Sequence, residues 1–121
     1  MSIFDNNIIT KIPFCAILQT KYEEAVRRAA GYCWAQSIES YDVFERMVRW
    51  SICDVLGSYL YNNRDYRCFS SETGFEYTPN RNGYENVIVR SVIFIVNKRT
   101  GEHIGYQLEE TVLIKIIDGS I

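Results

Sequence analysis

Few residues in this chain have the types and spacing that catalysis requires. His103 is the single histidine among 121 residues, and a cysteine or serine nucleophile needs a base that a third group orients. Cys15, Cys33, Cys53 and Cys68 stand far apart, without the closely spaced ligand pairs typical of zinc sites. No glycine-rich phosphate loop occurs. The sequence therefore predicts a protein that is not an enzyme, uses no metal or cofactor, and packs its cysteines as small core side chains.

One pair of charges is a candidate for a ligand pocket. Two long strands near the C-terminus each carry a single charge in an apolar row, Arg90 in the first and Glu110 in the second. A three-residue loop would place Arg90 opposite Glu110, and a loop longer by one would place it opposite Glu109. We expect the first register, because it leaves no lone charge in the apolar face. With Tyr106, the pair would line a pocket or form a salt bridge in the core.

The stretch of residues 59–84 is the second candidate site. It mixes tyrosine and phenylalanine with asparagine, serine, glycine and arginine, and its charges cancel. Rigid aromatic rings beside short polar side chains are typical of protein-binding surfaces. Stacking on single-stranded nucleic acid would need positive charge that this stretch lacks. Alternatively, half of the rings form core beneath short strands. The members expected to point outward are Tyr61, Tyr66, Arg67, Tyr77, Arg81 and Tyr84.

Periodicity predicts the elements that position these residues within one domain, residues 1–121. Residues 1–19 resemble an extended arm or an edge strand, since Pro13 lacks an amide donor. Residues 20–62 form a helical half, in which a second helix runs from Tyr41 to Tyr61. In the β half, residues 63–121, the expected strands are 66–70, 75–78, 87–97 and 102–117. We therefore expect an α+β fold, with two helices packed on one face of an antiparallel sheet of about four strands that ends in a long C-terminal β-hairpin.

Charge and hydropathy narrow the class of protein. The net charge of -2 argues against a general grip on nucleic acid, which needs a positive field. No apolar run approaches the length of a membrane span, and the start lacks the basic and apolar regions of a secretory signal. These observations predict a cytoplasmic protein with reduced thiols that has no membrane partner.

The favoured interpretation is a non-enzymatic binding module that recognises a protein partner by surface complementarity. Inhibitors, immunity proteins and counter-defence proteins of a phage or mobile element are of this type. The alternative is a small-molecule-binding protein with a cone-like helix–sheet pocket around Arg90 and Glu110, or an enzyme that uses this pocket. One face of the C-terminal hairpin also pairs an aliphatic strand with a mostly polar one. If that face is uncovered, it suits a homodimer.

Overall fold

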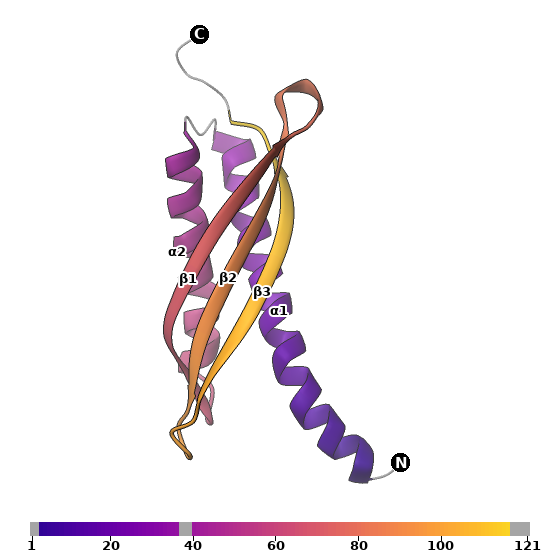
Figure 1. Ribbon diagram of the computed structural model, residues 1–121, viewed down its shortest axis with the longest axis vertical. Helices are drawn as coiled ribbons and strands as arrows, with labels where there is room; N and C mark the ends of the chain where they lie inside the picture. Colours follow the sequence, from indigo (N-terminus) through magenta and orange to yellow (C-terminus); the bar gives the residue numbers. More distant parts are fainter. Residues whose placement is uncertain (1–2, 37–39, 117–121) are drawn as a thin grey trace.

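The computed structural model describes residues 3–36 and 40–116, which form two layers. The elements are α1 (Ile3–Gln36), α2 (Tyr41–Tyr61), β1 (Tyr66–Pro79), the short 3-10 helix η1 (Arg81–Gly83), β2 (Glu85–Asn97) and β3 (His103–Ile114). The strands form an antiparallel sheet in the order β1-β2-β3, and both helices lie across one face of it (Figure 1). The predicted α+β class, with helices on one face and a C-terminal hairpin, is confirmed. None of the helices in these two ranges has the length and apolar character needed to cross a membrane.

The N-terminal segment differs from the prediction. From Ile3 onward, the residues expected to form an extended arm or edge strand belong to α1. A helix places residues at intervals of four on one face, and Phe14, Leu18 and Tyr22 use this spacing to reach the core. The Phe14 ring stacks on Tyr66 of β1, with 4.4 Å between the ring centroids. The apolar residues of this segment suit either type of element, and these long-range contacts are what favour the helix.

Helix α2 has the predicted bounds, Tyr41–Tyr61. Ser40 caps it, because the Ser40 Oγ accepts a hydrogen bond of 3.2 Å from the Val43 amide. Buried apolar residues recur every four positions along this helix, and the face that they form packs against the sheet and α1. This face consists of Phe44, Val48, Ile52, Leu56 and Leu60.

Strand β1 replaces the two short strands predicted for residues 66–70 and 75–78. It is continuous over 14 residues, so the described part of the chain has a sheet of three strands rather than about four. The segment 71–74, which separates the two predicted strands, contains serine, threonine and glycine, which are common in turns. Instead it pairs with β2, with Gly74 opposite Arg90. The ladder has one irregularity, between Cys68 and Ser70.

The hairpin of β2 and β3 has the register that we did not favour. Arg90 lies opposite Glu109, and Val89 lies opposite Glu110. The loop is residues 98–101 and ends at Gly101, which has a φ of 75°. It is closed by a hydrogen bond of 2.8 Å from the Asn97 amide to the Glu102 carbonyl. The predicted register is therefore wrong by one residue.

This shift of one residue changes which faces of the two strands coincide. The aliphatic face of β2 now joins the apolar face of β3, and the helices cover both. The buried residues on this joint face are Val87, Val89, Ile93, Ile95, Leu108, Val112 and Ile114. The half-aliphatic surface on which we based a homodimer therefore does not form, because its aliphatic row on β2 is in the core while its polar row on β3 lies on the exposed face. Dimerisation stays a prediction without that support.

Candidate functional site

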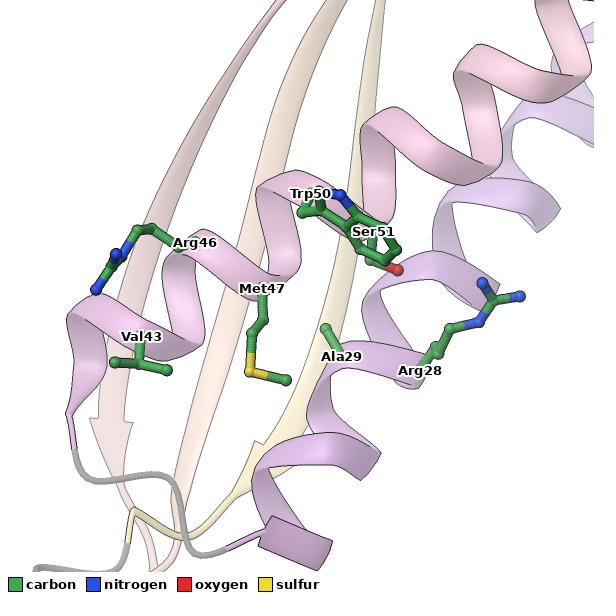
Figure 2. Close-up of a pocket in the computed structure, with 7 residues that line it drawn as sticks. All are labelled: Arg28, Ala29, Val43, Arg46, Met47, Trp50 and Ser51. Atoms are coloured by element: carbon green, nitrogen blue, oxygen red, sulfur yellow. The ribbon is translucent and has the colours of Figure 1, made fainter.

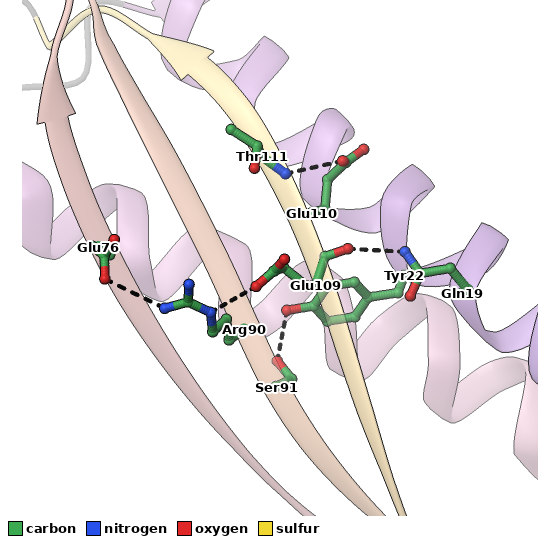
Figure 3. Close-up of polar contacts among 8 residues, drawn as sticks. All are labelled: Gln19, Tyr22, Glu76, Arg90, Ser91, Glu109, Glu110 and Thr111. Atoms are coloured by element: carbon green, nitrogen blue, oxygen red, sulfur yellow. Dashed lines mark hydrogen bonds and ion pairs between the residues drawn. The ribbon is translucent and has the colours of Figure 1, made fainter.

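The three residues of the predicted pocket lie on opposite faces of the sheet. The Arg90 side chain is 55 % exposed on the face without helices, where its Nε lies 2.6 Å from Glu109 Oε1 and its Nη1 lies 3.4 Å from Glu76 Oε1. Figure 3 shows this row across the three strands. The hydrogen bonds to Glu109 and then Glu76 raise the pKa of Arg90. Tyr106 and Glu110 instead face the helices. The Arg90/Glu110/Tyr106 pocket therefore does not form.

Glu110 has a different partner from the one that we predicted. Its side chain is 13 % exposed, and its Oε2 lies 2.6 Å from Arg27 Nε of α1, an ion pair whose angles fall short of a hydrogen bond. Its Oε1 accepts a hydrogen bond of 2.9 Å from the Thr111 amide. The carboxylate thus links α1 to β3 across the margin of the core. Its neighbours give it a structural role.

The six residues of the aromatic stretch, residues 59–84, that we expected to point outward lie in two groups, one near each end of β1. Tyr61, Tyr66 and Arg67 lie where α2 leads into β1, while Tyr77, Arg81 and Tyr84 lie at the turn between β1 and β2. At about 3.3 Å per residue, Tyr66 and Tyr77 are roughly 36 Å apart along the strand. The stretch is therefore not one continuous patch.

The prediction that these residues point outward holds for some of them only. Tyr61, Arg67 and Arg81 are exposed, whereas Tyr66 and Tyr77 are half-buried and pack against the core. The Tyr77 hydroxyl donates a hydrogen bond of 2.6 Å to Glu45 Oε2 of α2. Burial, together with this hydrogen bond, raises the pKa of Tyr77.

Tyr84 is also half-buried, and Lys115 Nζ lies 5.5 Å from its ring centroid. Tyr66 and Tyr77 thus contribute to packing between helices and strands, as the alternative interpretation of this stretch predicted for half of its rings.

Buried hydroxyls form a short chain between α1 and the sheet. The Tyr22 hydroxyl and Ser91 Oγ are 2.8 Å apart, and Thr73 Oγ1 lies 2.8 Å from the same Ser91 oxygen (Figure 3 draws the Tyr22–Ser91 bond). Burial raises the pKa of Tyr22 to about 12, although the hydrogen bond with Ser91 opposes the shift. Each hydroxyl has a partner, as buried polar groups require. This chain aligns α1 on the sheet.

The described cysteines and metal-ligating groups do not form a chemical site. Cys53 and Cys68 are exposed, so the prediction of core cysteines is wrong for these two. The side chains of Cys15 and Cys33 lie outside the described set. Within residues 3–36 and 40–116, the structure holds no group of three or more metal-ligating side chains.

A groove between α1 and α2 is the feature that sequence reasoning missed. It lies on the side of the helices away from the sheet, and Figure 2 shows the strands behind both helices. Its volume is about 510 Å³. Trp50, 66 % exposed, stands over it beside Met47 and Val43 of α2, opposite Ala29 of α1. Ser51 is buried at its floor, and its Oγ donates a hydrogen bond of 2.8 Å to the Ala25 carbonyl.

Among the described residues that line this groove, the two charged ones are both arginines. Arg28 comes from α1 and Arg46 from α2, and Figure 2 shows them flanking Met47 and Trp50. Arg28 Nη1 lies 3.7 Å from Asp54, and Arg46 Nη2 lies 3.0 Å from Asp42. These aspartates are not part of the lining. Because exposed ion pairs of this kind contribute little free energy, the arginines are available to another carboxylate.

One signal in the sequence pointed to this groove. The apolar stripe predicted for α2 is too wide for a single contact, since Val43 and Met47 flank the row of residues 44, 48, 52 and 56 that faces the core. Trp50 continues the outer row at helical spacing.

We compared the chain with protein-family models, curated proteins and solved structures, and none of the three comparisons gave a match.

Proposed function

We propose that this protein is a non-enzymatic, cytosolic protein-binding module, and that its partner binds in the groove between α1 and α2. The exposure of Trp50 beside Met47 in a concave surface is the observation that carries this proposal. Tryptophan, methionine and arginine are the residue types enriched at protein interfaces, and tryptophan and arginine dominate binding hot spots. An inhibitor, an immunity protein or a counter-defence factor needs only such a surface.

The small-molecule and enzyme alternatives have less support. Both depended on Arg90 and Glu110 lining one pocket, and these side chains lie on opposite faces of the sheet. Arg90 lines a second cavity, of about 640 Å³, on the open face, but Glu109 and Glu76 already occupy its guanidinium. The groove offers more uncommitted apolar surface, which favours a macromolecular partner.

The substitution Trp50→Ala tests the proposal. We expect it to weaken partner binding by at least about tenfold, because a central tryptophan contributes about 2 kcal/mol or more at interfaces. Its effect on the free energy of unfolding should stay within about 0.5 kcal/mol, since the side chain is exposed. The measurement is affinity capture of the tagged protein from its host, identification of the partner, and a dissociation constant for each purified pair.

Tyr61→Ala is the matched control for this experiment. Tyr61 is 85 % exposed on the same helix and lies outside the groove, so its loss should leave the dissociation constant unchanged. If Tyr61→Ala abolishes binding and Trp50→Ala does not, the groove proposal is wrong and the aromatic stretch is the better candidate.

A further inference from the structure

Building on the proposed function, we infer that the segment bound in the groove is an amphipathic α-helix whose apolar row is flanked by acidic residues. Such a helix would lie on the outer side of α1 and α2 and form a third layer of the molecule. The shape of the groove, the chemistry of its walls and the sign of its charges each support this assignment.

The shape of the groove suits a helix. α1 and α2 run antiparallel and side by side (Figure 1), so the surface between them is a trough between two cylinders. Val43, Met47 and Trp50 form a row at i, i+4 and i+7 on α2, which extends about 10 Å along its axis at 1.5 Å per residue. Two turns of a partner helix, with apolar residues at the same intervals, match this length.

The walls of the groove favour a helix over an extended peptide. Strand addition uses free backbone donors and acceptors at a sheet edge. Both walls here are helices, whose internal backbone groups already bond within each helix. Side chains alone are therefore presented to the partner. A helix satisfies its own backbone groups and offers a matching row of side chains.

The charges of the groove indicate which residues flank the apolar row of the bound helix. Arg28 and Arg46 stand on opposite walls, and the lining residues that the structure describes include no carboxylate. Their present partners, Asp54 and Asp42, contact them from outside the lining. A glutamate on each flank of a bound helix can replace these exposed contacts with charge-assisted hydrogen bonds in a less hydrated setting. The overall charge of -2 disfavours the rival polyanion, a single-stranded nucleic acid.

A phage-displayed peptide library gives the test. Each 18-residue peptide carries leucines along one face of a helix and Glu, Lys, Gln or Ser at the positions that flank this row. Peptides that bind the full-length protein are selected, and those that also bind the Trp50→Ala variant are removed. We expect glutamate to exceed lysine at both flanks. In fluorescence anisotropy, an enriched peptide should bind at least about tenfold more tightly than its Glu→Lys counterpart.

The double variant Arg28→Gln, Arg46→Gln is the control for charge. Both side chains are exposed, so the variant should fold, and it should retain Trp50-dependent binding while losing the preference for glutamate. Trp50-dependent peptides without an excess of glutamate would overturn the acidic assignment and leave the proposed function standing.

Two other results would overturn the inference. The first is that no peptide from the library shows Trp50-dependent binding, although binding of the captured partner still depends on Trp50. The segment of the partner that binds in the groove would then not be a helix of this type. The second is Trp50-dependent binding of a single-stranded oligonucleotide, which would make the groove a nucleic-acid site and would contradict the proposed function as well.

Discussion

At the residue scale, the buried polar side chains have a structural role. The Ser91 hydroxyl forms hydrogen bonds with the hydroxyls of Tyr22 and Thr73 where α1 crosses the sheet. Glu110 is tied to Arg27 at the margin of the same contact. Leaving any of these groups without a partner would cost free energy, because a buried donor or acceptor has lost its water. Their arrangement therefore specifies how α1 lies on β2 and β3.

Tyr22 makes stability depend on pH in the alkaline range. Burial raises its pKa in the folded protein to about 12 from 10.0, so the folded state holds the phenolic proton longer than the unfolded chain does. The free energy of unfolding should be insensitive to this group below pH 10 and should fall as the pH rises toward 12. Tyr22→Phe should cost about 1 kcal/mol at pH 7 and make the alkaline fall shallower.

Urea unfolding of both proteins between pH 7 and pH 11 measures this effect. Some fall should persist in Tyr22→Phe, because the pKa values of Tyr77 and Tyr41 are also raised. If both proteins lose stability with the same slope above pH 10, then Tyr22 is not buried as the structure has it.

At the element scale, β1 and the hairpin depend on pairing more than on local composition. The segment 71–74 has turn-forming residues, yet it forms the middle of a strand because β2 supplies hydrogen-bond partners along its length. Gly74 does not have a positive φ, in contrast to Gly83 and Gly101. A side chain added at Gly74 would meet no atom within 4 Å. This glycine therefore weakens a strand without serving a turn.

Replacing Gly74 with threonine should stabilise the protein. Glycine in a strand interior costs roughly 0.5–1 kcal/mol in backbone entropy, and threonine favours strands. We expect a gain of that size in the free energy of unfolding, measured by urea titration. Gly101→Ala is the comparison, and it should destabilise because of the φ of 75°. A loss in Gly74→Thr similar to that in Gly101→Ala would indicate that residues 71–74 form a turn after all.

At the scale of the whole molecule, the two faces of the sheet have different environments. Helices cover the face that includes Ile93, which is 1 % exposed. The opposite face carries the Glu76–Arg90–Glu109 row and half-buried apolar residues of β2 such as Ile88. An antiparallel sheet of this type commonly packs one face against the core and leaves the other in contact with water.

Paired truncations measure this difference between the faces. Ile93→Ala should cost about 2–5 kcal/mol, as expected for a fully buried isoleucine, whereas Ile88→Ala should cost about 1 kcal/mol or less. Urea unfolding at two protein concentrations gives both values. An equal loss at the higher concentration alone would indicate that a second copy covers the open face, and the protein would then dimerise through a different face of the hairpin from the one on which the homodimer was predicted.

Features governed by local rules were predictable from the sequence alone. The bounds of α2 follow from Ser40 and a four-residue apolar period, and the hairpin follows from alternation around a glycine-containing loop. The α+β class follows from the order of these patterns. The location of the candidate site was not predictable in the same way, because the groove exists only where residues of two helices meet. Tyr66 and Tyr77 show the converse, since their contacts with Phe14 and Glu45 removed them from the surface.

Tertiary contacts determined the remaining features, and each involved local alternatives that differ little in free energy. The segment before Leu18 suits a helix or a strand, and burial of Phe14 and Leu18 against the sheet favours the helix. Residues 71–74 suit a turn or a strand, and β2 favours the strand. Arg90 can oppose Glu109 or Glu110 on charge alone. Packing against the helices determines this register, because only one of the two registers places the aliphatic faces of β2 and β3 together beneath the helices. The free energy gained by burying that apolar surface outweighs the free energy of one ion pair.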